Sequence, residues 1–335
     1  MFAVITAGAV FIARRWSATG FDSVAFFRSI SNADWRWLLA AWVFSLLSYY
    51  GRALRWMVML RPLAPASRTH DVFSATVIGF SAVLLFGRPG EFIRPFLIAR
   101  HAGVSFLSQM AAWLLERIYD TLTLLILFGY ALAVVPSTKG VSPALRWILE
   151  KGGWFTGVSC SICLAALVAL HLYSGLLEQR LLGALGFLEQ HHHEKAARIV
   201  RTAMDGFHST RNGRSITLLF AYSALEWTIV SLIFYAIFQA FPQTAVLPWS
   251  SIFVYLGFVA FGSIVQVPAI GGGVQIVSTL VLTEFFHLRL EAAASIALVS
   301  WVFTLVGILP VGFIYALRQG LTWRNIKDME KQAGL

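Results

Sequence analysis

The chain has 335 residues, of which 58% are hydrophobic and only 13% are charged. Soluble domains carry about 25% charged residues, so this composition excludes a soluble globular protein and indicates an integral membrane protein. The formal net charge is +10, but the basic residues flank apolar segments, where they attract anionic lipid headgroups and control topology. We therefore expect no nucleic acid partner.

The long apolar segments predict an all-α, polytopic transmembrane helical bundle, because only helices and closed barrels satisfy their backbone hydrogen bonds in lipid. The expected membrane segments, about 7–9 in number, are residues 1–13, 35–60, 70–86, 105–135, 154–172, 215–240, 250–267, 269–286 and 292–317. The first lacks a basic leader and spans only about 20 Å. We expect either a retained, half-length helix or a true start upstream of Met1.

Two of these segments are interrupted by glycine and proline, at residues 87–95 and 268–275. Paired interruptions in corresponding halves are typical of transporter binding sites; the alternative is a coincidence between two loop–helix junctions. We expect two broken or re-entrant hairpins in a possible internal repeat. The expected single membrane domain, 1–335, comprises a first half (1–153), a cytoplasmic amphipathic connection (173–214), a second half (215–317) and a basic cytoplasmic tail (318–335).

The distribution of Lys and Arg predicts the orientation. Residues 14–36, 173–214 and 318–335 hold four, six and four, whereas residues 61–70, 136–153 and 241–249 hold two, three and none. The positive-inside rule then places the first set, with the C-terminus, in the cytoplasm of a bacterial-type inner membrane. In that arrangement residues 70–135 cross an even number of times and residues 250–317 an odd number. Whether residues 269–286 cross or re-enter stays open.

Polar residues recur along one face of the segment 35–60. Ser45, Ser48, Arg52 and Arg55 follow one another at spacings of three, four and three, which places them on one stripe of a helix. The two arginines either extend to the outer headgroups, where the adjacent Trp56 also suits the interface, or face a cavity inside the protein.

The first break carries three charges at spacings of three, Arg88, Glu91 and Arg94. Charges within hydrocarbon cost roughly 2.5–3.5 kcal/mol each, so they persist where they pair or bind something. The planar guanidinium group grips phosphate with two parallel hydrogen bonds. These residues therefore indicate an anion site, or alternatively an Arg–Glu clasp that closes the loop.

Carboxylates lie inside the following segment. Glu116 and Asp120 share one helical face, with Arg117 beside them. We expect the two carboxylates to pair with arginines of the preceding segments, Arg88, Arg94 or Arg52. Glu226, in the segment 215–240, is a further buried carboxylate. Glu116, Asp120 and Glu226 are candidates for proton coupling, and simple pairing with a neighbouring helix is the alternative for Glu226.

The second break is uncharged. Gly271, Gly272 and Gly273 expose backbone N–H groups at the start of a helix, where the dipole favours an anion, and Gln275 follows. Close packing of a helix crossing would leave the same pattern of glycines.

The sequence indicates neither a metal site nor a cofactor. Cys160 and Cys163 lie in an apolar segment without polar partners and are expected to be small buried side chains. The adjacent histidines 191–193 cannot all face one ion on a helix, so a solvated tract is expected. No HExxH, Walker A or GxSxG motif is present, so we do not expect an enzyme.

Three motifs together resemble the flippase-like integral membrane family that includes the membrane domain of lysylphosphatidylglycerol synthase. They are Arg52-Ala-Leu-Arg55-Trp56, Gly87-Arg-Pro-Gly90-Glu91-Phe-Ile-Arg94 and Leu115-Glu116-Arg117-Ile-Tyr-Asp120. Val267-Pro-Ala-Ile-Gly271-Gly-Gly273-Val274 is similar to the second signature of that family. The resemblance covers roughly residues 35–317.

The resemblance implies translocation of an anionic or aminoacylated lipid, or of a lipid-linked precursor, between leaflets. Carried over residue by residue, it implies that substrate contacts Arg52, Arg55, Arg88, Glu91, Arg94, Glu116, Arg117 and Asp120. The family's second-half Arg-Glu and Tyr-Arg pairs are replaced here by Gln275-Ile276 and Ser300-Trp301, so the substrate is expected to differ. The lysyl-transferring domain is not found in this sequence.

We therefore expect a lipid flippase whose partner is an anionic membrane lipid, working beside a separate lipid synthase or glycosyltransferase. Two other functions remain open: a proton-coupled transporter of a small anion, and a non-transporting partner of a lipid-modifying enzyme. A lipid substrate predicts a cavity that opens sideways to the bilayer, whereas a soluble one predicts a cavity closed to it.

Overall fold

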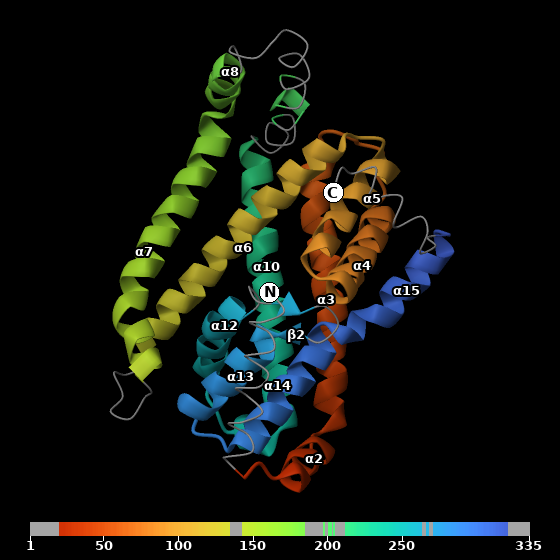
Figure 1. Cartoon of the computed structure of the whole chain (residues 1–335). Coiled ribbons are helices and arrows are strands. Elements are labelled where there is room, and N and C mark those ends of the chain that lie inside the picture. The colour runs from red at the N-terminus through yellow and green to blue at the C-terminus, as the bar shows by residue number, and fades with distance from the viewer. Residues whose placement is uncertain are drawn as a thin grey trace.

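The apolar segments form helices in the computed structural model, which describes residues 20–134, 143–184, 197, 200–202, 204, 212–262, 266–267 and 271–320. The longest helices are α3 (Trp35–Leu60), α4 (Thr69–Phe86), α6 (Phe106–Val134), α7 (Pro143–Leu172) and α10 (Gly213–Ala240). The expected helical bundle is confirmed (Figure 1). The expected segment 1–13, the tail beyond residue 320 and most of the connection 173–214 lie outside the described residues; α8 (Ser174–Ala184) begins that connection.

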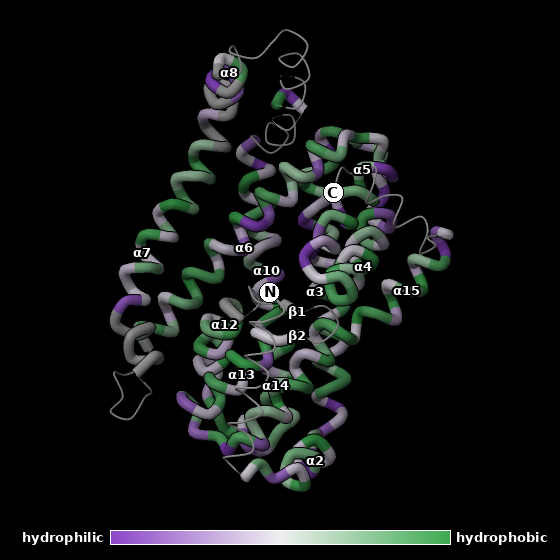
Figure 2. Tube along the Cα trace, viewed as in Figure 1, coloured by the Kyte–Doolittle hydropathy of each residue, from purple (hydrophilic) through white to green (hydrophobic). Residues whose placement is uncertain are grey.

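Among the described residues, four stretches are long and apolar enough to cross a bilayer: Thr69–Phe86, Lys151–Ala169, Gly213–Ala240 and Leu290–Arg318. α3 and α6 have comparable length and carry the charged residues singled out above. Figure 2 shows hydrophilic stretches within the group of α3, α4 and α5, and also at α2, at α8 and at the end of α15. The protein is therefore an integral membrane protein with charge placed inside the bundle.

The first break turns the chain back on itself. Gly87 has φ +72°, a conformation that glycine adopts without strain, and the 3-10 helix η1 (Arg88–Phe92) leads into α5 (Ile93–Ala102). α5 packs against α4, and a Cβ at Gly79 would lie 2.5 Å from the Cβ of Arg94. Glycine at position 79 therefore allows the two helices to approach closely, which brings Arg94 into the bundle.

The second break also turns the chain back. α12 (Ser250–Gly262) leads to a short antiparallel pair, β1 (Gln266–Val267) with β2 (Gly271–Gly272), and then to α13 (Gly273–Glu284). The Tyr255 hydroxyl lies 2.9 Å from Ser278 Oγ and joins the two helices.

α13 ends near the end of α10, since the rings of Phe286 and Phe238 lie 6.4 Å apart. α12 begins near the same end of α10, to which the four-residue helix α11 (Pro242–Ala245) connects it. α12 and α13 thus enter the bundle and return to the same end. Of the two alternatives that the sequence left open for residues 269–286, the structure has the returning one and not the crossing one.

The last expected segment, 292–317, is not one helix. α14 (Leu290–Thr304) is followed by the 3-10 helix η3 (Val306–Ile308) and by α15 (Leu309–Arg318). Pro310 lacks an N–H and cannot continue a regular helix. Two side chains of α3 satisfy carbonyl groups that the break leaves unpaired: Tyr49 Oη donates to Thr304 O (2.9 Å) and Trp42 Nε1 donates to Gly307 O (3.1 Å).

The two hairpins pack crosswise. α4, from the first hairpin, lies against α15, where Gln319 Nε2 donates to Ser74 Oγ (2.8 Å) and the Tyr315 ring meets the ring of Phe73. α12, from the second hairpin, lies against α6, where the rings of Phe128 and Phe258 are 5.2 Å apart. The first hairpin therefore packs against α15 of the second half, and the second hairpin packs against α6 of the first half.

The orientation expected from charge needs a correction. α3 and α10 are antiparallel, since Asp34 N donates to Ala240 O (2.9 Å) while Arg55 meets Ser223. Residues 20–34 therefore lie at the same end as residues 241–249, not at the end where Asn212 precedes α10.

The physical reason is that α4 and α5 return to their starting end, so that residues 70–135 cross once, through α6. The expectation of an even number of crossings is wrong. The odd number expected for residues 250–317 agrees with the structure, because the second hairpin returns and α14 with α15 crosses once. One end of the bundle holds residues 61–70, the start of α10 at Gly213 and the end of α15 at Arg318. The sequence stretches that include these positions, 61–70, 173–214 and 318–335, contain two, six and four basic residues.

Single-cysteine labelling tests this topology. In a variant whose two native cysteines are replaced, we expect Asn32→Cys and Gln243→Cys to react with a membrane-impermeant maleimide from one side, and Asn212→Cys from the other. All three positions are exposed at helix ends. Labelling of positions 32 and 212 from the same side would contradict the antiparallel packing of α3 and α10.

Candidate functional site

Arg55 on α3 is the centre of a buried charge cluster. Its guanidinium group binds Asp120 through two hydrogen bonds, Nη1–Oδ1 at 2.7 Å and Nη2–Oδ2 at 3.2 Å. Nη2 also donates to Glu116 Oε1 at 2.6 Å, and Nη1 donates to Ser223 Oγ at 3.1 Å. The Arg55 side chain is 1% exposed. One arginine thus joins α3 to both α6 and α10.

Arg94, on α5, reaches the same cluster. Its Nη1 donates to Glu116 Oε2 at 2.9 Å, and its Nη2 donates to the backbone carbonyl of Arg52 at 3.3 Å. The guanidinium carbon lies 4.2 Å from the centre of the Trp56 ring, within range of a cation–π contact. Glu116 is 0% exposed and is held between Arg55 and Arg94.

Two further arginines complete the cluster on its more open side. Arg52 Nη2 lies 2.8 Å from Glu226 Oε1, and Arg117 Nη2 lies 3.4 Å from Asp120 Oδ2. The Arg52 and Arg117 side chains are 18% and 37% exposed, whereas Glu226 is 1% exposed. Exposure therefore rises from Arg55 towards Arg117, which is the arginine of the cluster most accessible to solvent.

The cluster lies inside the bundle. Arg55 stands five residues before the end of α3, and Glu116 and Ser223 stand ten residues after the starts of α6 and α10. At 1.5 Å per residue, these groups lie about 8–15 Å from that end of the helices. Of the two alternatives that the sequence left open for Arg55, extension to the headgroups is therefore wrong, and Trp56, at 0% exposed, is a core residue and not an interfacial one.

The ion pairs leave several buried polar atoms without a hydrogen bond. The Nε atoms of Arg52, Arg55, Arg94 and Arg117 have no acceptor, and Glu226 Oε2 has no donor. Arg55 Nη1 approaches Glu226 Oε2 to 3.1 Å, close enough for an ion pair but without the alignment of a hydrogen bond. Unpaired buried donors are costly, so the cluster holds four donors whose hydrogen bonds the described side chains do not supply.

The structure brings together six of the eight first-half residues expected at the site: Arg52, Arg55, Arg94, Glu116, Arg117 and Asp120. The other two, Arg88 and Glu91, lie on η1 at a surface, where Arg88 Nη1 is 4.0 Å from Glu91 Oε1 and its side chain is 62% exposed. The contact between them matches the clasp that the sequence left as an alternative. Arg94 separates from them because α5 turns it inwards.

At the second break, the Gln275 side chain accepts a hydrogen bond from Gly272 N (2.7 Å). The backbone N–H of Gly272, one of those expected to bind an anion, therefore donates to a side chain of the protein. An anion role for Gly271, Gly272, Gly273 and Gln275 stays a prediction.

Four residues of the site were not anticipated. Ser223 binds Arg55, Phe80 lies 5.1 Å from the Arg52 guanidinium carbon, and Gln109 Oε1 accepts from Trp56 Nε1 at 2.9 Å. The fourth, Trp56, stacks on Arg94. Ser223 stands three residues before Glu226, so helical spacing could have indicated it; Phe80 and Gln109 carry no comparable signal.

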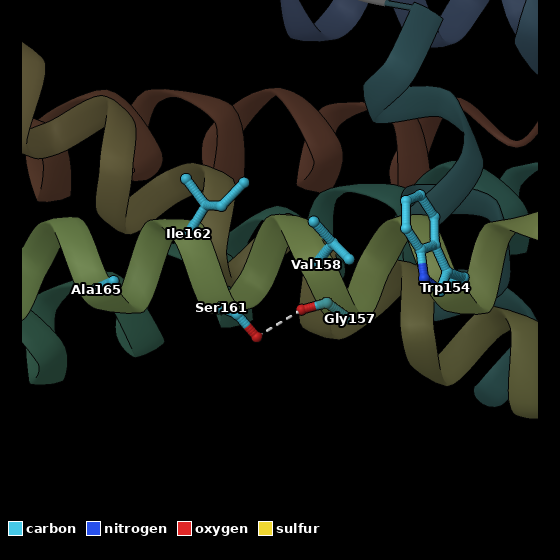
Figure 3. A pocket seen from close by; sticks show the side chains of 6 residues that line it. All are labelled: Trp154, Gly157, Val158, Ser161, Ile162 and Ala165. Atoms are coloured by element: carbon cyan, nitrogen blue, oxygen red, sulfur yellow. Dashed lines mark hydrogen bonds between the residues drawn. The ribbon is translucent and has the colours of Figure 1, made fainter.

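A shallow hollow lies elsewhere, along one face of α7. It is lined by Trp154, Gly157, Val158, Ser161, Ile162 and Ala165, all on this helix (Figure 3). Ser161 Oγ donates to its own helix, at Gly157 O (2.9 Å), and no lining residue is charged. Cys160 and Cys163 on the same helix are half-buried and unbridged, not fully buried as expected. The hollow thus lacks groups that would bind an anion.

No group of three or more His, Cys, Asp or Glu side chains is placed to hold a metal ion within the described ranges. Histidines 191–193 lie outside those ranges.

The fold and the cluster define a polytopic helical membrane protein with two returning hairpins and an arginine-rich ionic centre. The chain belongs to the family described as "Lysylphosphatidylglycerol synthase TM region", whose model matches residues 2–312. This family relates the protein to lipid metabolism. Comparison with curated proteins gives no match, and comparison with solved structures gives none.

Replacing Arg55 tests its structural role. Arg55→Ala would leave Asp120, Glu116 and Glu226 without their shared cation, and removing one partner of a buried ion pair costs about 3–5 kcal/mol. We expect a loss of that order in the free energy of unfolding in detergent. Arg289→Ala, at a side chain 79% exposed, is the control, for which a change below about 1 kcal/mol is expected. Equal losses of unfolding free energy in both variants would contradict the central role of Arg55 in the cluster.

Proposed function

We propose that the protein is a lipid flippase that moves an anionic phospholipid or a lipid-linked precursor between the leaflets of a bacterial-type inner membrane. In this proposal the end that holds residues 61–70, the start of α10 and the end of α15 faces the cytoplasm, because the sequence stretches that adjoin it, 61–70, 173–214 and 318–335, carry the larger share of basic residues. The proposal keeps the cytoplasmic C-terminus that the sequence indicated and puts residues 20–34 on the opposite side.

The cluster of four arginines inside the bundle is the observation that supports this function. Four guanidinium groups face three carboxylates, and each guanidinium retains an unpaired Nε donor. A lipid phosphate offers the missing negative charge and acceptor oxygens, while its acyl chains stay in the bilayer. Arg117 and Arg52, the most exposed arginines of the cluster, meet the headgroup first.

The carboxylates hold the arginines in place. Glu116 fixes Arg55 and Arg94, Asp120 fixes Arg55, and Glu226 fixes Arg52. Geometry set in advance lowers the entropic cost of binding. The returning hairpins, α4–η1–α5 and α12–β1–β2–α13, are the elements whose movement would open the site to one side or the other. Proton coupling through Glu116, Asp120 or Glu226 stays a prediction.

A transport assay tests the proposal. Purified protein is reconstituted in vesicles with a fluorescent phosphatidylglycerol, and lipid movement is followed by dithionite quenching of the outer leaflet. We expect Arg117→Gln to slow movement about tenfold, because a hydrogen bond to a charged group contributes about 1.5–3 kcal/mol. Arg289→Gln is the matched control, with the same substitution at an exposed arginine outside the cluster, and should keep the wild-type rate.

Other results assign the protein elsewhere. Wild-type protein that moves no lipid but accumulates a soluble anion would favour the small-anion transporter. Protein that moves neither, yet co-purifies with a lipid synthase or glycosyltransferase, would favour the non-transporting partner. An unchanged rate in Arg117→Gln would remove the exposed arginine from the mechanism.

A further inference from the structure

We infer that the cluster selects a headgroup with a net charge of −1, a phosphodiester that carries no cationic group, over both a zwitterionic headgroup of zero net charge and a doubly charged phosphomonoester. This inference rests on the proposed function and specifies the substrate class of the same site. Two observations support it: the cluster has four arginines and three carboxylates, and its most exposed arginine is Arg117.

Four elements supply the charged side chains of the cluster, and α4, which also packs there, supplies Phe80 and Gly79 while its charged residues His70 and Asp71 pair with each other at its start. α3 contributes Arg52 and Arg55, α5 contributes Arg94, α6 contributes Glu116, Arg117 and Asp120, and α10 contributes Glu226. Each member lies within 4 Å of an opposite charge in the cluster. Arg88 and Glu91 of η1 pair with each other and contribute no net charge. The described cluster therefore carries one unmatched positive charge.

The unmatched charge is located at the open side. Glu116 and Glu226 are 0% and 1% exposed and lie in direct contact with Arg94, Arg55 and Arg52. Arg117 shares Asp120 with Arg55 and holds it at the longer distance, 3.4 Å against 2.7 Å. Arg117 is also the most exposed member of the cluster. It is therefore the arginine whose charge is least neutralised and most accessible to a ligand.

A single negative charge neutralises this site, and any other number does not. A headgroup of zero net charge leaves the positive charge at Arg117 uncompensated, and a dianion leaves a negative one. Both are disfavoured beside carboxylates that are almost fully buried, where the effective dielectric constant is lower than in water. A phosphomonoester has a second pKa near 6 and is almost fully doubly charged at about pH 8, whereas a phosphodiester carries one charge. The two headgroups therefore separate by charge at that pH.

Binding selectivity tests the inference independently of transport. Purified protein at pH 8 is offered equal amounts of phosphatidylglycerol, phosphatidic acid and phosphatidylcholine, and bound lipids are counted by native mass spectrometry. We expect wild-type protein to prefer phosphatidylglycerol over each of the others. Glu226→Gln, which adds one net positive charge, should raise the ratio of phosphatidic acid to phosphatidylglycerol about tenfold, the effect of one charge at roughly 10 Å with an effective dielectric constant of about 20.

Two substitutions at position 117 complete the design. Arg117→Gln makes the cluster neutral and should bring phosphatidylcholine binding up to the level of phosphatidylglycerol, whereas Arg117→Lys keeps the charge and the wild-type preference. Arg289→Gln, outside the cluster, should change neither ratio. Thermal unfolding in the same detergent identifies any variant that is not folded, and the Arg117 pair then carries the test in place of Glu226→Gln.

The outcomes separate the two proposals. Lipid ratios that are identical in wild type, Glu226→Gln and Arg117→Gln overturn the charge-matched site, whether or not lipid moves in vesicles. Charge-dependent ratios without lipid movement support the site and contradict the flippase. Soluble glycerol phosphodiester in excess forms a further arm: displacement of all bound phosphatidylglycerol would assign the site to a soluble anion and overturn the lipid headgroup.

Discussion

The ion pairs of Arg55 are the constraint on which the rest of the structure depends. This side chain binds carboxylates from α6 and α10 while it is almost fully buried. Charges removed from water are tolerated only when paired and hydrogen-bonded, so these helices keep the relative positions that the pairing requires. The first hairpin follows from the same demand, because it delivers Arg94 to the second oxygen of Glu116. The ionic cluster thus fixes the relative positions of α3, α5, α6 and α10.

Helical periodicity and apolar segment length predicted the bundle and both breaks from the sequence. They predicted the face shared by Glu116 and Asp120, since residues four apart on a helix are neighbours. They did not predict that Arg55 lies between those residues and Glu226, because contacts between helices depend on tertiary packing and not on local spacing. The division of the last segment into α14 and α15 was missed although Gly307 and Pro310 stand in it, because hydropathy alone does not register a break.

The error in orientation has an instructive cause. Assigning connections to sides from their basic residues also requires the number of times the chain crosses between them. The first hairpin changes that number, because it returns to the end from which it starts. Arg14, Arg15, Arg28 and Arg36 weighed towards the cytoplasm, yet Asp34 is hydrogen-bonded to the far end of α10. Topology rules assume that apolar segments span, and returning hairpins violate that assumption in both halves.

The crosswise packing of the hairpins has a consequence for biosynthesis. α4 leaves the ribosome more than two hundred residues before α15, the helix that covers it. Since domains grow from the N-terminus at about 5–20 residues per second, the first hairpin waits at least ten seconds or so for its partner. During that interval its flank is open to other membrane helices, so an insertase or chaperone would be in demand there. Loss of the final helix by a premature stop codon would therefore damage a site encoded almost wholly upstream.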